Sequence, residues 1–99
     1  MSEIYFDRLR SLVIEYIDVI KAHEPESHSI EWFLMKYLTK IEKVSQTPAI
    51  PGEVEGSIRS LVRFYVDNIE ENTELGDICT RVYNEYHKVL KEYQEHQSQ

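Results

Sequence analysis

The chain has little of what marks many protein classes: 99 residues contain one cysteine, three glycines, three prolines and no long hydrophobic run. The single cysteine, Cys79, excludes an internal disulfide framework and is typical of a reducing compartment. So few glycines and prolines argue against an all-β domain with many tight turns. The longest apolar stretch, Trp32 to Met35, is far too short to span a membrane. The first residues show no basic segment followed by an apolar run, so we expect no signal peptide and a cytoplasmic protein.

Positive charge is missing from two parts of the chain, which is its most informative absence. Neither Ala22–Met35 nor Phe64–Thr80 contains a Lys or Arg. Their eight acids exceed the net charge of −7, because the remaining residues hold ten acids against all eleven bases and come to +1. Such an acidic balance argues against binding to a nucleic-acid backbone. The eight acids of the two segments are Glu24, Glu26, Glu31, Asp67, Glu70, Glu71, Glu74 and Asp77.

Apolar residues that recur every three or four positions predict four amphipathic helices. An apolar content of 41% and seven tyrosines indicate one globular domain with its own core rather than a disordered chain. No segment alternates with the two-residue period of a strand, so we expect an all-α fold. The expected helices are about 3–22, 29–45, 54–71 and 73–94, with a frayed tail at 95–99 within the single domain 1–99.

Capping and helix-breaking residues predict where these helices end. Pro25 disfavours helical geometry at the residue before it and should end the first helix. The segment 46–52, which contains Pro48 and Pro51, should form the one longer connection. Short polar side chains are favoured at helix N-caps because they accept a hydrogen bond from the first turn. The expected N-caps are Ser2, Ser29 and either Asn72 or Thr73.

Four helices joined by short loops favour an antiparallel up-and-down bundle. In that topology the turn between the first two helices and the turn between the last two lie at the same end. The two segments without Lys or Arg would then form one negatively charged end, which we call the acidic pole. Cys79 lies on the apolar stripe of the fourth helix and is expected to be a buried, inert thiol.

The acidic pole is the candidate site. Asp67, Glu70 and Glu71 are expected in the last turns of the third helix, where the helix dipole favours cations and each acid should cost up to about 1 kcal/mol. This placement favours retention of the charge for binding a positive partner. Trp32 is expected to point away from the core beside the pole, as an interface anchor would. The predicted partner-binding residues are the eight acids together with Trp32.

Other chemistry has weaker support. His23 and His28 flank two acids in one turn and could join carboxylates from other helices around a divalent metal, but their spacing matches no known zinc or iron pattern. We therefore predict no metal site and no cofactor. No nucleophile stands in a catalytic arrangement and no phosphate-binding loop is present, so we do not expect an enzyme.

The charge pattern favours a small cytoplasmic binding protein that neutralises a basic protein partner, in particular an immunity or inhibitor protein for a toxic nuclease domain. In size, charge and predicted helicity, though in no sequence motif, the chain is similar to the small acidic helical immunity proteins of bacterial toxin systems. The alternative is a structural or regulatory adaptor that self-associates through an exposed aromatic stripe. Monomer and dimer both remain open. Neither a nucleic acid nor a membrane is an expected partner.

Overall fold

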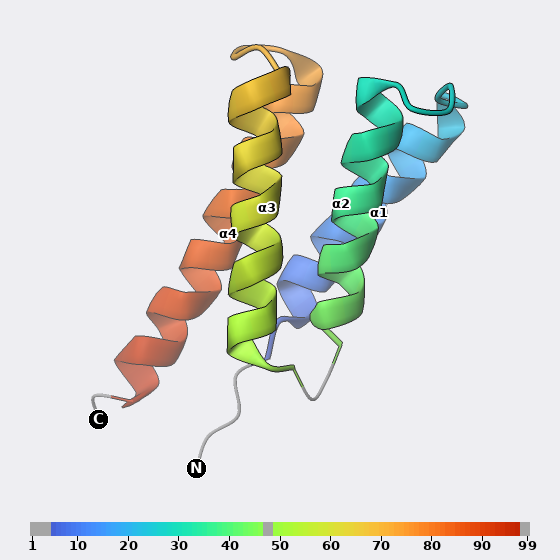
Figure 1. The fold of residues 1–99 in the computed structure, drawn as a ribbon. Coiled ribbons are helices and arrows are strands. Elements are labelled where there is room, and N and C mark those ends of the chain that lie inside the picture. The colour runs from blue at the N-terminus through green and yellow to red at the C-terminus, as the bar shows by residue number, and fades with distance from the viewer. Residues whose placement is uncertain (1–4, 47–48, 98–99) are drawn as a thin grey trace.

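The structure, a computed structural model, describes residues 5–46 and 49–97. They form four helices and no strand, which confirms the predicted all-helical class (Figure 1). No helix in this part of the chain combines the length and apolar character needed to cross a bilayer. The helices are α1 (Asp7–Ala22), α2 (Ile30–Val44), α3 (Pro51–Asn68) and α4 (Glu74–Gln97).

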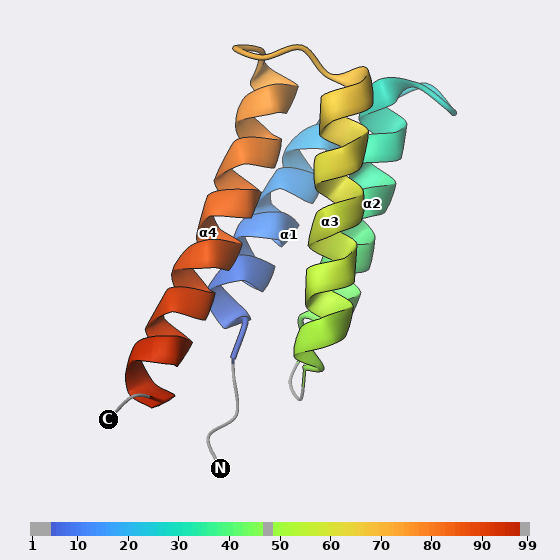
Figure 2. The same ribbon diagram turned by 60° about the vertical axis from the view of Figure 1, so that its left-hand side comes forward.

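The four helices pack as a compact bundle. Each helix contacts the next one along the chain, and α4 also contacts α1. The bundle measures 47 × 24 × 18 Å along its principal axes. Figures 1 and 2 both show the α1–α2 turn and the α3–α4 turn at one end, while α2 ends and α3 begins at the other. The two segments that lack Lys and Arg therefore share one end of the molecule.

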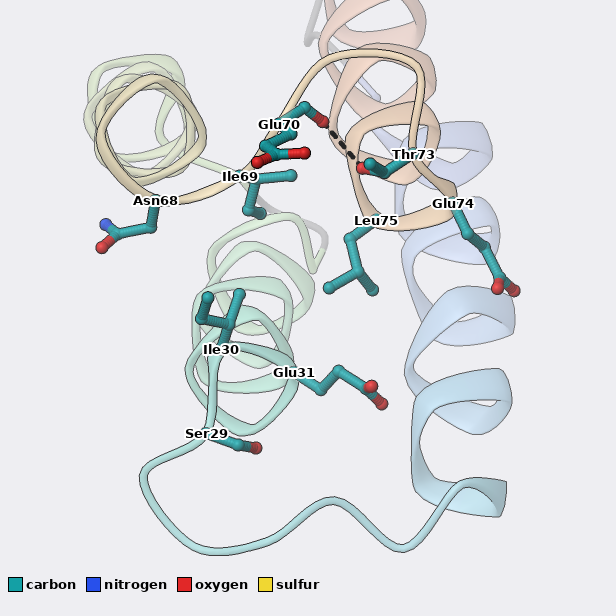
Figure 3. Close-up of a pocket in the computed structure, with 9 residues that line it drawn as sticks. All are labelled: Ser29, Ile30, Glu31, Asn68, Ile69, Glu70, Thr73, Glu74 and Leu75. Atoms are coloured by element: carbon teal, nitrogen blue, oxygen red, sulfur yellow. Dashed lines mark hydrogen bonds between the residues drawn. The ribbon is translucent and has the colours of Figure 1, made fainter.

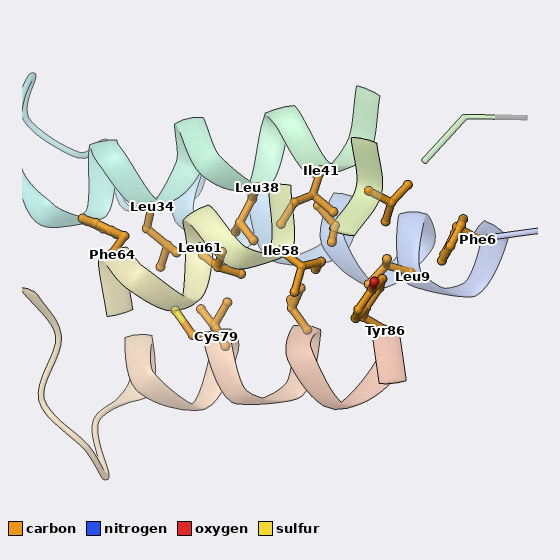
Figure 4. Close-up of a cluster of buried hydrophobic side chains, with 14 of the residues drawn as sticks. Phe6, Leu9, Leu34, Leu38, Ile41, Ile58, Leu61, Phe64, Cys79 and Tyr86 are labelled. Carbon is orange, nitrogen blue, oxygen red and sulfur yellow. The ribbon is translucent and has the colours of Figure 1, made fainter. Parts of the chain in front are cut away.

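The core is built from the predicted apolar stripes and runs along the bundle (Figure 4). Burial of these side chains is the main favourable contribution to folding, at roughly 25 cal/mol per Å² of apolar surface. Cys79 is buried as predicted, and its burial raises the pKa of the thiol to about 12, so the thiol stays protonated at neutral pH. The fully buried large apolar side chains are Phe6, Leu9, Val13, Ile20, Leu34, Leu38, Ile41, Val54, Leu61 and Val82.

The predicted start of the first helix near residue 3 is wrong, because α1 begins at Asp7. Phe6 precedes it with non-helical backbone angles (φ −106°, ψ 28°) and forms no side-chain cap. Its ring is fully buried and stacks on Tyr86 with centroids 6.2 Å apart. The chain thus enters the bundle by burying an aromatic side chain rather than by polar capping. The expected cap at Ser2 lies outside the described residues.

The other helix limits differ from prediction by a few residues. α2 begins after its predicted cap, Ser29, whose Oγ accepts a hydrogen bond from the Trp32 N–H at 3.2 Å. α3 begins at Pro51 rather than near 54, because proline suits the first helical position, where its missing N–H costs nothing. α4 continues to Gln97, so residues 95–97 are helical rather than frayed. Residues 98–99 and Pro48 lie outside the described part of the chain.

The end of α3 corrects the sequence interpretation of the acidic pole. The helix ends at Asn68, three residues before the predicted end, and the backbone of Ile69 is extended (φ −120°, ψ 131°). Glu70 and Glu71 therefore belong to the α3–α4 turn and not to the last turn of the helix. Asp67 alone of the three lies within the final turn, so the dipole argument applies to that residue only.

Candidate protein-binding site

The α1–α2 turn is shaped by Pro25 and by two residues with left-handed backbone angles. Glu24, which precedes the proline, has φ 48°, and His28 has φ 68°. Such angles are uncommon for residues with a side chain and reverse the chain over a short distance. The Ser29 cap then starts α2 at once. As a result Ile30 and Glu31 are presented at the edge of the bundle, directly beside the turn.

The α3–α4 turn is held by a small hydrogen-bond network around Thr73. The Thr73 hydroxyl donates to the Glu70 carbonyl at 2.7 Å and accepts from the Gly76 N–H at 3.1 Å, so Thr73 caps α4 as predicted. Asn72 has a positive φ of 63°. A Cβ on Gly76 would lie only 2.9 Å from the Glu70 carbonyl oxygen. Gly76 is therefore needed for this close approach, a role that sequence reasoning missed.

A cleft opens between the two turns (Figure 3). Its volume is about 580 Å³. Ile30, Ile69 and Leu75 point into the space between the turns and form an apolar floor. The carboxylates of the cleft come from both acidic segments, one from α2 and two from the α3–α4 turn and the start of α4. The lining residues are Ser29, Ile30, Glu31, Asn68, Ile69, Glu70, Thr73, Glu74 and Leu75.

The acids of this end lack compensating positive charges. Glu31 has the one ionic contact, 3.7 Å from His23 Nδ1, and that contact is ionic only when the imidazole is protonated. Among the described residues, no Lys or Arg forms a salt bridge with any of the other seven predicted acids. All seven are exposed. Their negative fields therefore add without local neutralisation, which raises the attraction for a cationic partner.

Not every predicted site residue lies at the cleft. Glu31, Glu70 and Glu74 line it, whereas Asp67 lines a separate hollow of about 360 Å³ between α2 and α3 that includes Arg63. The remaining predicted acids line neither hollow; they are Glu24, Glu26, Glu71 and Asp77.

Trp32 projects from a different face of α2. Its half-buried ring lies 4.8 Å from the ring of His28 and 4.9 Å from that of Phe33, and Lys36 Nζ lies 4.9 Å above it. It does not line the cleft. Stacking by neighbours of its own helix and turn gives the tryptophan a defined orientation on the outer surface. Its predicted role as an anchor remains a prediction.

The two histidines of the α1–α2 turn have different neighbours. His23 lies near Glu31, while His28 Nδ1 lies 3.1 Å from the Ser27 hydroxyl and the ring packs on Trp32. Over residues 5–46 and 49–97 no three His, Cys, Asp or Glu side chains are grouped closely enough to hold a metal ion. The arrangement at this end is therefore one of surface charge around an apolar cleft.

Comparison with known proteins adds no relative from which a role could be transferred. No family model, no curated protein and no solved structure matches the chain. The functional interpretation therefore depends on the geometry and charge described above.

Proposed function

We propose that this chain is a small binding protein that neutralises a basic protein partner through its acidic pole. The cleft between the two turns carries the proposal, because it joins an apolar floor to carboxylates that no Lys or Arg compensates. Protein interfaces commonly combine an apolar centre with a polar rim. The partner class that this chemistry suits is a toxic nuclease domain, which would make the chain its immunity or inhibitor protein.

Electrostatics is the reason for proposing a nuclease as the partner. An enzyme that binds a nucleic acid has a groove lined with Lys and Arg, which receives a row of phosphates. Exposed carboxylates at one end of a small protein can occupy such a groove in place of the phosphates. Unpaired charges of this kind also raise association rates by about 10- to 1,000-fold at low salt. Rapid capture is what protection from a toxic enzyme requires.

The apolar floor of the cleft can contribute binding affinity that charge alone does not provide. Ile30 is 45% exposed at the cleft, so an apolar side chain of the partner would remove it from water. Desolvated apolar contacts at the centre of an interface usually supply most of the affinity, whereas charges at its rim mainly affect association rate and specificity. Trp32 would add a second contact on the adjoining face of α2, where it is half-buried.

The proposal includes an antiparallel up-and-down order of the helices in the cytoplasm. The shared end of the two turns in Figures 1 and 2 supports that order. The single buried thiol supports the compartment. Together they describe a monomeric or dimeric inhibitor that meets its partner inside the cell that makes it.

Affinity capture with matched baits tests the proposal. The baits are the wild-type protein, the Glu70→Lys/Glu71→Lys variant, and a control, Glu15→Lys/Asp18→Lys, with the same change in net charge on exposed positions of α1. We expect a basic protein to be captured by the wild type and the control, and not by the Glu70→Lys/Glu71→Lys variant. Calorimetry at low salt with that protein should show at least about ten-fold weaker binding for this variant alone.

Two results would contradict the proposal. Equal binding by the wild type and the Glu70→Lys/Glu71→Lys variant would show that the pole is not the docking surface. An equal loss of binding in the control would show that overall charge, rather than its position, determines affinity. Circular dichroism of each bait measures its helical content and so distinguishes a loss of binding from unfolding.

A further inference from the structure

A second surface lies on the outer face of α3 and α4, away from the acidic cleft. Val66, 70% exposed, and Tyr83, 39% exposed, border an almost entirely apolar hollow of about 160 Å³. Val62 and Tyr83 also line an adjoining hollow of about 520 Å³, so the two form one groove between the helices. Exposed apolar residues gathered around a groove commonly mark an interaction site.

The charges along the exposed side of α3 change sign at this groove. In α3, Arg63 precedes the exposed Val66 and Asp67 follows it. Arg63 and Asp67 are four residues apart on the helix, yet they form no salt bridge in the structure. A basic residue placed before an acidic one is the less favourable order for such a pair. Both side chains thus remain available to charges from another molecule.

We propose that a second copy of the chain covers this groove, with the two α3 helices antiparallel about a twofold axis at the level of Tyr65. This arrangement places Arg63 of each copy opposite Asp67 of the other. Val66 and Tyr83 lie at the centre of the contact and are removed from water. A twofold contact requires a surface that is complementary to itself.

The order of charges selects a second copy over other occupants. When the second helix is a reversed copy of the first, Arg63 and Asp67 of each helix both meet an opposite charge. A uniformly basic or uniformly acidic partner would match one end and be repelled at the other.

The proposed dimer shares only Asp67 with the acidic pole and leaves the cleft of the proposed function free. None of the residues in the proposed contact lines the cleft between the two turns. Each copy of a dimer would therefore keep its cleft open to a basic partner. Failure of the dimer would leave the partner-binding proposal intact, and the reverse also holds.

Sedimentation equilibrium of the full chain, at physiological ionic strength and up to millimolar concentration, tests the contact. The wild type is expected to dimerise, and Val66→Lys is expected to raise the dimer dissociation constant at least about ten-fold, because it buries a charge at the centre. Lys43→Glu, an exposed charge reversal on α2, is the matched control and should not change dimerisation. A monomeric wild type, or unchanged dimerisation of Val66→Lys, would overturn the proposal.

A charge exchange distinguishes the proposed register from any other association. Arg63→Asp alone places two acids opposite each other, and Asp67→Arg alone places two bases opposite each other, so each variant should be monomeric. Mixing the two variants should restore a one-to-one dimer, since both contacts then join opposite charges. A mixture that stays monomeric while both variants keep their helical circular dichroism would refute the register.

Discussion

Ion pairs between arginines and carboxylates occur in the rest of the bundle, which we call the body, but not among the described residues of the acidic pole. In the body three arginines each contact a carboxylate, and two of these pairs join different helices. At the pole no acid contacts an arginine or lysine of the described residues. The absence of compensation is therefore local and not a general property of this acidic chain. The three body pairs are Arg8 with Glu92 (2.6 Å), Arg10 with Glu42 (2.8 Å) and Arg59 with Glu55 (2.8 Å).

This difference separates the residues that should determine the stability of the fold from those that should determine partner binding. The body contains the continuous apolar core, and its ion pairs each add at most about 1 kcal/mol. The pole gains little from its exposed acids and is weakened by their mutual repulsion. Substitutions in the body should therefore change the free energy of unfolding, while substitutions at the pole should change partner binding.

Removing a core side chain should have the largest effect on stability. Leu38 is fully buried in α2, so Leu38→Ala is expected to lower the free energy of unfolding by about 2–5 kcal/mol through lost apolar contact and a residual cavity. Lys40→Ala, on the exposed side of the same helix, should change it by no more than about 0.5 kcal/mol. Urea unfolding followed by circular dichroism measures both. A loss below 1 kcal/mol for Leu38→Ala would contradict the packing described here.

Two glycines should respond in opposite directions to the same substitution. Gly76→Ala places a Cβ against the Glu70 carbonyl and is expected to destabilise the protein by about 1–3 kcal/mol. Gly56→Ala meets no atom within 4 Å inside α3 and should stabilise it by about 0.5–1 kcal/mol through reduced chain entropy. Thermal unfolding compares them directly. If Gly76→Ala were also stabilising, the α3–α4 turn would not be as tight as the structure shows.

Neutralising single acids should give the smallest effects, again with opposite signs. Glu42→Gln removes the partner of Arg10 and should lower the free energy of unfolding by about 0.5–1 kcal/mol. Glu70→Gln relieves repulsion at the pole and should raise it by a few tenths of a kcal/mol at low salt. Added salt should reduce the gain from Glu70→Gln more than the loss from Glu42→Gln, whose carboxylate is partly buried. If both variants changed the free energy of unfolding in the same direction, the distinction between body and pole would be contradicted.

Periodicity and capping chemistry predicted most of the fold. The apolar stripes identified the helices and the buried face of each, because a helix returns to the same side every 3.6 residues. Ser29 and Thr73 were predictable as caps because their hydroxyls satisfy helix N–H groups that have no partner within the helix. These signals depend only on residues close in the chain, so they can be recognised without knowledge of the neighbouring helices.

Other features depend on contacts that the local sequence does not encode. Phe6 stacks on Tyr86 just before α1 begins, and Gly76 approaches Glu70 closely in the completed α3–α4 turn. By its spacing Ile69 continues the apolar stripe of α3. In the structure it lies beyond the end of α3, in extended geometry, and lines the cleft. Gly76 in the first turn of α4 was the sequence signal for the close approach to Glu70, because glycine disfavours a helix interior.

The sequence by itself determined four amphipathic helices, their buried faces and the two segments without positive charge, because periodicity, propensity and composition are properties of the chain. Tertiary structure alone decided that Ile30 and Glu31 would meet Ile69, Glu70 and Leu75 across one cleft. It also decided that Arg63 and Asp67, on either side of the exposed Val66 in α3, would form no salt bridge with each other. Such placements follow from packing of residues far apart in the chain, where distance and orientation depend on every helix at once.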